Sequence, residues 1–406
     1  MRYGLLGKTL KHSYSKQIHE SLANYTYEYF ELEEDKLDEF FSRDDLGGLN
    51  VTIPYKQTVM KYCTWISPDA EKIGAVNTIV FDKGEVRGYN TDIDGMIYMI
   101  SRLLDISGMK VTILGNGASS KTAIEAAKRL GASDVKRISR SGDHKFSDKD
   151  YYKDTDVFIN ATPVGMYPNN LKKLIDLADF NPKAVFDLVY NPNKTSFLMD
   201  ADRLRIPNDN GLRMLVYQAK AAVELFLDKR ISDDVVEGLV NKIRRDAMNI
   251  TLIGMPGCGK STVAKRLAKI SGRKLVDIDK EIEKKYGPIS EIFAKKGEAY
   301  FRKIEAKVME AVFKESSQII STGGGVVTIP RNFYLLHQNS LIYMIDRPNY
   351  KLATNNRPLY EKYTVSEIRK QRMGLYLRFS DKRFNNYSAN KTAHQIWEDY
   401  NENIYY

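Results

Sequence analysis

NITLIGMPGCGKSTVAKRLAKIS occupies residues 249–271 of this 406-residue chain and decides the fold of its second half. Within it, residues 254–261 (GMPGCGKS) match the whole phosphate-binding loop pattern GxxxxGK[S/T]. A short apolar run precedes the loop and an amphipathic helical pattern follows it, which is the order that such a loop requires. The glycines let backbone N–H groups converge on phosphate oxygens, and the helix N-terminus adds a favourable dipole. The sequence therefore predicts a parallel α/β domain that binds ATP or GTP.

The residues of this loop that we expect to contact the nucleotide are Gly257, Cys258, Gly259, Lys260, Ser261 and Thr262. Lys260 should reach the β- and γ-phosphates, and the Ser261 hydroxyl should bind Mg²⁺. Further on, KLVDIDKEIE has a strand pattern that ends at Asp277 and Asp279. Because alternate residues of a strand share a face, we expect both carboxylates to point toward the loop. Asp277 would join the Mg²⁺ shell and Asp279 would meet a substrate hydroxyl, but the pair alone fits a turn or a helix cap equally well.

Four more motifs follow in order: Phe301-Arg302, the triple glycine Gly323–Gly325, Arg357-Pro-Leu and Arg372-x-x-x-Tyr376. Together with the loop and the two aspartates they resemble shikimate kinase over nearly all of residues 248–406. The resemblance implies that Lys260 and Asp279 are catalytic and that Arg357, on a lid, contacts ATP. It also implies that shikimate is held by Asp279, Arg302, Gly324 and Arg372. The chemistry agrees, because arginines suit a carboxylate and a carboxylate suits ring hydroxyls.

Residues 111–120 (VTILGNGASS) form a strand pattern that runs into a glycine turn and a helical pattern. The turn resembles a dinucleotide-binding turn in which Ser120 replaces the usual third glycine, and a small residue there still permits close packing of helix and strand. The next strand pattern ends at Arg140, which fits the 2′-phosphate of NADP by bidentate pairing. The predicted cofactor contacts are Gly115, Asn116, Gly117, Ala118, Ser119, Ser120, Ser139 and Arg140.

Further motifs of the first half are HSYS (12–15), LGGLNVTIPYKQ (46–57), GYNTDIDG (88–95), INATPVGM (159–166) and NGLRMLVYQAK (210–220). With the glycine turn they resemble shikimate dehydrogenase across residues 1–246. The resemblance implies that Lys56 and Asp92 form the catalytic pair. This makes chemical sense, because an ammonium group stabilises and protonates the alkoxide that hydride transfer to a ketone creates.

The same resemblance implies the binding roles. Ser13 and Ser15 would hold the shikimate carboxylate, and Thr52, Asn77 and Gln218 would meet ring hydroxyls, with Tyr190 nearby. The remaining cofactor contacts would be Thr162, Met166 and Gly211. Relatives in this family accept quinate or use NAD, so the choice between NADP and NAD and the acceptance of quinate stay open.

Composition excludes several classes of protein. Hydrophobic residues make up 43% of the chain and charged residues 28%, as in ordinary globular proteins. We find neither an apolar run of the ~18 residues that a membrane span needs nor the pattern of a signal peptide. The two cysteines, Cys63 and Cys258, cannot form a disulfide scaffold, so we expect a reducing, cytoplasmic environment. The five histidines are scattered, and we expect no structural zinc.

Charge is divided unevenly along the chain. Residues 1–250 hold 35 basic and 36 acidic residues, whereas residues 251–406 hold 27 basic and 16 acidic ones. A basic half could serve nucleic acid, an anionic membrane or small phosphorylated ligands. Its basic residues alternate with acidic ones, so we expect small-molecule substrates and neither nucleic acid nor a membrane as partners. Oligomeric state is not predicted.

The hydrophobic periodicity predicts an α/β chain of three lobes. Strands are expected at 3–6, 111–114, 157–159, 184–188, 251–253, 319–321 and 341–345, a hairpin at 77–90, and long helices at 94–104 and 211–227. The lobes are a substrate-binding lobe (1–104, with 211–246 returning to it), a Rossmann-like NADP lobe (105–210) and a P-loop kinase lobe (247–406). The boundary before the kinase lobe is expected near 242–248, with a new strand starting at Asn249.

The two resemblances describe consecutive reactions. The leading hypothesis is a bifunctional enzyme that reduces 3-dehydroshikimate with NADPH and phosphorylates shikimate with ATP-Mg²⁺, on the route to chorismate and the aromatic amino acids. A second hypothesis makes the first half a quinate/shikimate dehydrogenase that works in the oxidative direction. A third makes one half a ligand-sensing or scaffolding module that has lost catalysis, against which the intact Lys56/Asp92 and Lys260/Asp279 pairs argue.

Overall fold

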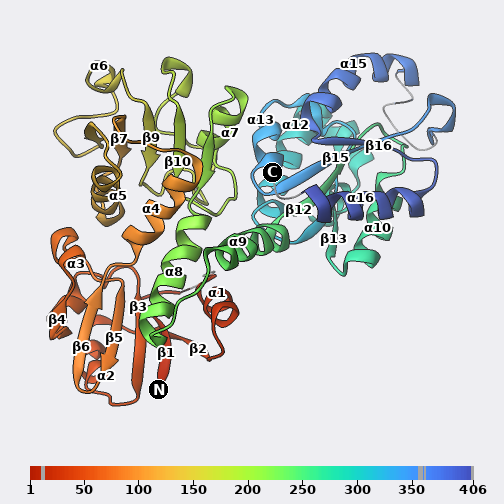
Figure 1. The fold of residues 1–406 in the computed structure, drawn as a ribbon. Helices are drawn as coiled ribbons and strands as arrows, with labels where there is room; N and C mark the ends of the chain where they lie inside the picture. The colour runs from red at the N-terminus through yellow and green to blue at the C-terminus, as the bar shows by residue number, and fades with distance from the viewer. Residues whose placement is uncertain (11–13, 355–359, 361–362, 404–406) are drawn as a thin grey trace. The chain divides into compact units, whose positions relative to one another are not determined.

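A computed structural model describes residues 1–10, 14–354, 360 and 363–403 (Figure 1). Two of the predicted site residues, Ser13 and Arg357, lie outside the described residues. The chain forms two compact units. The first unit comprises residues 1–166, 172–190 and 200–240, and the second comprises residues 167–171, 191–199 and 241–406.

The first sheet of the first unit is mixed, with the strand order β2-β1-β3-β5-β6-β4. Its strands are β1 (Arg2–Gly7), β2 (Tyr27–Glu31), β3 (Leu46–Val51), β4 (Trp65–Ile66), β5 (Thr78–Asp82) and β6 (Glu85–Tyr89). The short helices around it are α1 (Ser15–Leu22), α2 (Leu37–Phe41) and α3 (Pro68–Ile73). β5 and β6 pair antiparallel around Lys83 and Gly84, which both have positive φ (48° and 86°), so the predicted hairpin forms.

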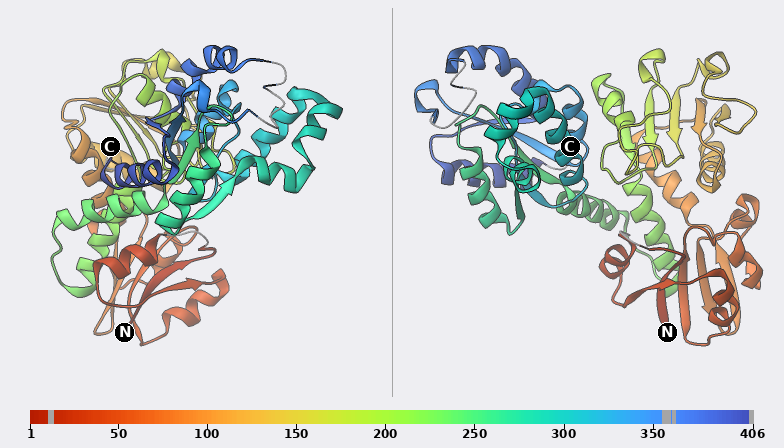
Figure 2. Two further views of the ribbon diagram at one scale, coloured as in Figure 1. Left: turned by 90° about the vertical axis from the view of Figure 1, so that its right-hand side faces the viewer. Right: turned by 180° about the vertical axis from the view of Figure 1, so that it is seen from behind.

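The second sheet of the first unit is wholly parallel, with the order β11-β10-β9-β7-β8. Its elements are β7 (Lys110–Leu114), α5 (Ala118–Arg129), β8 (Asp134–Ile138), α6 (Lys149–Tyr152), β9 (Val157–Asn160), β10 (Ala184–Asp187), α7 (Ser196–Arg203) and β11 (Asn208–Asn210). The order reverses between β7 and β9, and ligands of open α/β sheets bind outside the carboxyl ends of the strands at such a point. Two long helices, α4 (Asp92–Leu103) and α8 (Leu212–Leu227), pack against each other and connect the two sheets (Figures 1 and 2).

The second unit is built on a parallel sheet with the order β13-β14-β12-β15-β16. The strands are β12 (Asn249–Ile253), β13 (Lys274–Asp277), β14 (Gln318–Ser321), β15 (Ser340–Asp346) and β16 (Lys382–Asn385). Its helices are α10 (Lys260–Ser271), α11 (Ile278–Tyr286), α12 (Ile289–Val312), α13 (Arg331–His337), α15 (Val365–Phe379) and α16 (Ala389–Asn403), and α9 (Asp233–Ala247) belongs partly to each unit. The central strand β12 is fully buried, so the loop that follows it starts from the core of the unit.

Every strand predicted from the sequence overlaps an observed one, and β12 starts at Asn249 as expected. One local expectation is wrong. Asp277 ends β13, but Asp279 lies in the first turn of α11 and not on the strand. The two units divide between Val240 and Asn241, close to the boundary expected at 242–248, and α9 runs across this division to Ala247.

Two short segments of the first half of the sequence belong to the second unit. In one of them the Tyr167 hydroxyl donates to the carbonyl oxygen of Phe313 (2.9 Å). In the other, the Asn193 backbone N–H donates to Oδ1 of Asn339 (2.7 Å). The second unit therefore includes residues that lie far from 241–406 in the sequence and form hydrogen bonds with it. Across the described ranges, no helix has both the length and the apolar character that crossing a membrane requires.

Candidate active sites

A cavity of about 240 Å³ in the first unit gathers most of the side chains that the first-half motifs predict as substrate contacts. They come from α1, β3 and the loop after it, the start of β5, the head of α4, the loop after β10, and α8. The seven predicted residues that line the cavity are Ser15, Thr52, Lys56, Asn77, Asp92, Tyr190 and Gln218. The structure thus brings together every predicted substrate residue of this half that it describes.

A charge pair lies at the centre of this cavity. Nζ of Lys56 donates to Oδ2 of Asp92 at 2.5 Å, and both side chains are largely shielded from solvent. The other carboxylate oxygen, Oδ1 of Asp92, accepts a hydrogen bond from Nδ2 of Asn77 (2.9 Å). Asp92 is the first residue of α4, where a negative charge is favourable. The ammonium group is thereby held in one place on the wall of the cavity.

Two further cavity residues, Tyr190 and Gln218, come from segments far from Lys56 and Asp92 in the sequence. Gln218 lies on α8, and its Nε2 donates to the carbonyl oxygen of Leu215 (2.9 Å), which leaves its side-chain oxygen to the cavity. Tyr190 follows β10, and burial raises the pKa of its hydroxyl, so this group stays protonated and able to donate. Hydroxyl and amide groups around the cavity suit a polyhydroxylated ring.

Asn50 also lines the cavity, and the motif analysis did not assign it a role. It stands two residues before Thr52, and alternate residues along an extended segment share a face. That spacing is the signal that could have identified it, since Thr52 was already predicted to contact the substrate.

The second candidate site surrounds the phosphate-binding loop after β12. Gly257 has φ of 79°, and a Cβ there would lie 2.2 Å from the carbonyl oxygen of Ala353, so only glycine fits this turn. Lys260, at the start of α10, is 8% exposed, and its Nζ donates to the carbonyl oxygens of Gly254 (2.9 Å) and Met255 (3.1 Å). The ammonium group therefore already lies inside the curve of the loop that would hold phosphate.

Two oxygen ligands suitable for Mg²⁺ lie side by side next to this loop. The Ser261 hydroxyl donates to Oδ2 of Asp277 at 2.9 Å. A hydroxyl and a carboxylate are the hard oxygen donors that Mg²⁺ takes, usually together with waters and substrate phosphates. The pair therefore fits the predicted metal role, although Asp279 does not share its strand.

Asp279 lies among acidic groups. Burial raises its pKa to about 6, and the carboxylates of Asp277 and Glu305 add to the effect. Glu305 is 1% exposed and accepts from Nη1 of Arg302 (2.8 Å), while Nη2 of Arg302 donates to Glu298 (3.0 Å). Burial also raises the pKa of Glu305. The sequence analysis missed Glu305, and its signal is the three-residue spacing from Arg302 on one face of α12.

The glycine-rich turn after β14 connects the remaining predicted residues. The carbonyl oxygen of Gly324 accepts from Nη1 of Arg372 (3.1 Å) and from the hydroxyl of Tyr376, both on α15. A Cβ on the preceding Gly323 would lie 2.9 Å from Oδ1 of Asp279 and 3.0 Å from Oε1 of Glu305. The predicted residues Asp279, Arg302, Gly324 and Arg372 thus converge on one region beside the loop.

Comparison with known proteins identifies a domain family in each half of the chain. The model of the shikimate dehydrogenase substrate binding domain matches residues 5–79, and the shikimate kinase model matches residues 256–402. The shikimate dehydrogenase (NADP(+)) of Caldicellulosiruptor bescii is 34% identical over 254 residues, which are 55% of this chain and 88% of that protein. The chain belongs to the shikimate dehydrogenase family. Its second half carries a shikimate kinase domain, so the predicted fusion is confirmed, as are the predicted α/β fold class and the prediction that the chain is an enzyme.

Solved structures of the dehydrogenase family resemble the first half. A chorismate mutase/shikimate 5-dehydrogenase fusion protein from Clostridium acetobutylicum is 34% identical, with a TM-score of 0.56, over 59% of this chain and 96% of that one. The shikimate 5-dehydrogenase of Listeria monocytogenes, solved with shikimate and NAD, is 30% identical with a TM-score of 0.53, over 59% of this chain and 96% of that one. Together with the kinase domain, these findings make the chain a bifunctional enzyme of the shikimate pathway.

The predicted cofactor turn of the dehydrogenase half lies where the order of its parallel sheet reverses. Gly115, after β7, has φ of 130°, and a Cβ there would lie 2.9 Å from Cγ2 of Thr162, which follows β9. The fully buried Ser120 donates from Oγ to the carbonyl oxygen of Gly115 (2.9 Å), so the serine fixes the turn that it was predicted only to tolerate. Gly115 and Thr162 are therefore in contact at the expected position.

The other predicted cofactor residues lie after β7, β8 and β9 and at the start of α8. Asn116, Gly117, Ala118 and Ser119 are exposed at the start of α5, as is Arg140 after β8, and Met166 is 47% exposed. Ser139 is buried, and its backbone N–H donates to the carbonyl oxygen of His144 (3.0 Å). Gly211 caps α8, where a Cβ would lie 2.2 Å from the carbonyl oxygen of Leu188. None of these residues lines the cavity that contains Lys56 and Asp92.

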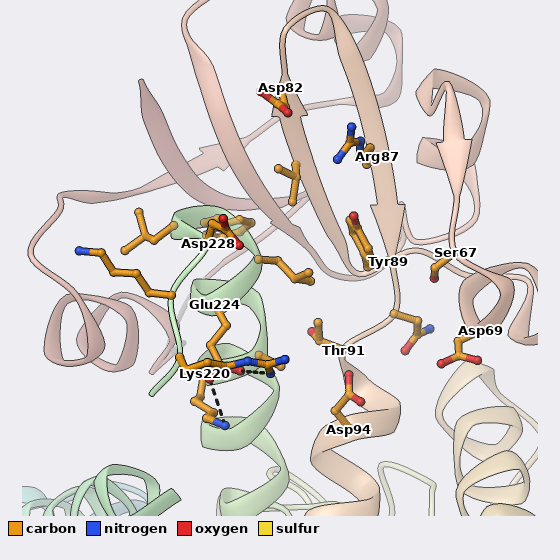
Figure 3. Close-up of a pocket in the computed structure, with 18 of the residues that line it drawn as sticks. Ser67, Asp69, Asp82, Arg87, Tyr89, Thr91, Asp94, Lys220, Glu224 and Asp228 are labelled. Carbon is orange, nitrogen blue, oxygen red and sulfur yellow. Dashed lines mark ion pairs between the residues drawn. The ribbon is translucent and has the colours of Figure 1, made fainter. Parts of the chain in front are cut away.

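A larger cavity of about 910 Å³ lies between the β5–β6 hairpin, α8 and the start of α4 (Figure 3). Charged side chains line it, among them Arg87, Asp94 and Lys220. Lys220 already pairs with Glu224 (3.3 Å) and Asp233 (3.0 Å). None of the predicted catalytic side chains lines this cavity, so the smaller cavity with Lys56 and Asp92 is the better candidate for the substrate.

Proposed function

We propose that the first half reduces 3-dehydroshikimate to shikimate with NADPH and that the second half phosphorylates the 3-hydroxyl of shikimate with ATP. The observation that carries this proposal is the Lys56–Asp92 pair inside a cavity lined by hydroxyl and amide side chains. In this proposal residues 1–104 and 211–246 form the substrate lobe, residues 105–210 the cofactor lobe and residues 247–406 the kinase lobe.

The reduction relies on Lys56 as the proton donor. NADPH, when bound, supplies the hydride. As negative charge develops on the ketone oxygen, the ammonium group of Lys56 stabilises it and transfers a proton to it. Asp92 holds the ammonium group in place and Asn77 holds Asp92, so the donor is oriented before the substrate arrives. Ser13 and Ser15 would bind the substrate carboxylate, and Thr52, Asn77, Tyr190 and Gln218 would bind its hydroxyls.

NADP is the favoured cofactor because an exposed arginine follows β8. Arg140 stands where an NAD-specific site usually offers an acid, and a guanidinium group pairs with the 2′-phosphate of NADP. The exposed turn of residues 116–119 supplies the start of α5, whose N–H groups suit the pyrophosphate. The curated relative from Caldicellulosiruptor bescii is also described as NADP(+)-dependent.

The phosphorylation relies on Asp279 and the phosphate-binding loop. Asp279, as a carboxylate, accepts the proton of the attacking hydroxyl, while Arg302, Gly324 and Arg372 hold shikimate. Lys260 and Arg357 would stabilise the charge of the transferred phosphoryl group. Ser261 and Asp277 would hold Mg²⁺, which when bound neutralises charge on the phosphate oxygens.

The test is a single reaction with 3-dehydroshikimate, NADPH and ATP-Mg²⁺, followed by mass detection of shikimate and its phosphate. We expect shikimate phosphate only when NADPH is present. Shikimate without its phosphate would refute the kinase assignment, and absence of shikimate would refute the dehydrogenase assignment. Parallel reactions with NADH, and with quinate in the reverse direction, measure the two specificities that the sequence leaves open.

A further inference from the structure

A chain of buried hydrogen bonds leads away from the catalytic carboxylate into the first sheet. Oδ1 of Asn77, whose Nδ2 binds Asp92, accepts from the backbone N–H of Thr91 (2.7 Å). The hydroxyls of Thr91 and Thr78 are 2.9 Å apart, and Oγ1 of Thr78 also accepts from Nδ2 of Asn50 (3.2 Å). The head of α4, β5 and β3 are thus joined through side chains behind the substrate cavity.

This chain ends at a tyrosine outside the cavity. The Tyr27 hydroxyl donates to Oδ1 of Asn50 at 2.8 Å. Tyr27 lies on β2 and Asn50 on β3, with β1 between them, so only a long side chain can reach across. Tyr27 is 0% exposed and Asn50 is 4% exposed, and Tyr27 does not line the substrate cavity. The ring of Tyr27 packs with Leu5 and Leu10, which line the cavity, whereas its hydroxyl is linked to the cavity through Asn50.

The environment of Tyr27 determines which way the Asn50 amide faces. Burial raises the pKa of the Tyr27 hydroxyl well above its usual value, so this group keeps its proton and can donate. A donated hydrogen bond requires Oδ1 of Asn50 to face Tyr27, which turns Nδ2 toward Thr78. The ring of Tyr27 stacks on His19 with centroids 4.0 Å apart at 9°. Burial lowers the pKa of His19 to about 3, so the stacked ring is neutral.

We propose that Tyr27 is a positioning residue of the dehydrogenase: its hydroxyl fixes the Asn50 amide and, through Thr78 and Thr91, supports the groups that bind the substrate ring. The inference rests on the proposed function, since it assumes that shikimate occupies the cavity that Asn50 lines. Without the hydroxyl, the Asn50 amide can turn over and present the wrong atom to the cavity. The predicted effect is on substrate binding more than on the proton transfer from Lys56.

The experiment compares Tyr27→Phe with wild type in shikimate oxidation with NADP+ and in calorimetric titration with shikimate. Losing one buried hydrogen bond should raise KM and Kd about fivefold, while kcat stays within about twofold. The ring remains, so its stacking on His19 is kept. Kinase turnover of the same preparation and a thermal melt check that the chain is folded. An unchanged KM and Kd in Tyr27→Phe would overturn the inference.

Tyr25→Phe is the matched control. It also removes one hydroxyl, but that hydroxyl contacts Nδ1 of His19 (2.8 Å) and not Asn50. We expect this variant to keep the wild-type KM and Kd. If both variants raise KM equally, the effect is a general loosening of the sheet and the positioning role is wrong.

A double-mutant cycle tests the route through Asn50. In the background Asn50→Ala, the added change Tyr27→Phe should alter KM by less than about twofold, because the group that it positions is gone. A full fivefold effect in that background would overturn the inference. Failure of the proposed function looks different: wild type itself would then neither oxidise nor bind shikimate, and the inference would fall with it.

Discussion

The two active sites treat their essential charges in opposite ways. In the dehydrogenase half, Lys56 and Asp92 neutralise each other at 2.5 Å, so the cation and the carboxylate are both in place without any ligand. In the kinase domain, Lys260 donates to main-chain carbonyl oxygens of its own loop, and Asp279 lies near the acidic groups Asp277 and Glu305. The first site is organised by its own side chains, whereas in the second we propose that a bound nucleotide and Mg²⁺ would balance the charges.

This difference fits the chemistry that we propose for each site. Protonating a ketone needs one cation at one point, and a single carboxylate from a helix terminus can hold it. Phosphoryl transfer brings several negative charges into the site. Backbone N–H groups of the loop can bind the phosphate oxygens, and the Lys260 ammonium group, which donates to carbonyl oxygens, can pair with their charge. The predictions below test this contrast, starting with the largest effect.

Replacement of the preformed cation should give the largest effect. Lys56→Ala removes the proton donor and leaves Asp92 without its partner, so we expect reduction of 3-dehydroshikimate to fall about 10³-fold. Phosphorylation of added shikimate should stay within about twofold, because Lys56 belongs to the first unit only. Initial rates of both reactions on one preparation check this. Equal reductase rates for wild type and variant would support the sensor hypothesis for the first half.

Replacement of the kinase carboxylate should come next in size. Asp279→Asn keeps the shape of the side chain but removes the acceptor for the hydroxyl proton, and we expect a loss of about 10²-fold in kcat. Nucleotide affinity, measured with a fluorescent ATP analogue, should be unchanged because the loop and Ser261 are intact. Wild-type turnover in this variant would mean that another group accepts the proton, and Glu305 would be the first to examine.

Much of both sites could be predicted because each depends on short motifs with strict local geometry. The loop from Gly254 to Ser261 follows a buried strand, and NTD places Asp92 at a helix start, so the motif alone implies the local structure. Alternation of apolar residues also located the β5–β6 hairpin and the strand that begins at Asn249. Where the local pattern determines the fold, the sequence analysis and the structure agree.

The error at Asp279 occurred where a strand pattern ends and a helical pattern begins. Asp277 and Asp279 were expected on one strand, but Ile278 and Ile282 are both buried four residues apart, which is a helical spacing that already includes Asp279. No local pattern reveals that Tyr167 and Asn193 contact the kinase domain, because those hydrogen bonds join residues more than 140 positions apart. Tyr27 is similar, since its role appears only when three strands are side by side.

A pH profile tests the acidic surroundings of the kinase carboxylate. Because the pKa of Asp279 is raised to about 6, the carboxylate becomes protonated as pH falls through this value and loses its ability to accept a proton. We therefore expect kcat/KM for shikimate to be constant above pH 7 and about tenfold lower at pH 5. Reduction measured in the same buffers shows whether the chain stays intact. A flat kinase profile down to pH 5 would show that Asp279 does not act as the base.

The smallest expected effect concerns the cofactor choice of the dehydrogenase half. Arg140→Gln removes an exposed guanidinium group, and a charge-assisted contact with the 2′-phosphate at a solvated site should be worth about a fivefold change in KM for NADPH. KM for NADH should not change, since NADH lacks that phosphate. Arg137→Gln is the matched control, because Arg137 is exposed on β8 three residues earlier and should leave both values unchanged. If Arg140→Gln changes KM for NADPH and KM for NADH by the same factor, Arg140 does not recognise the 2′-phosphate.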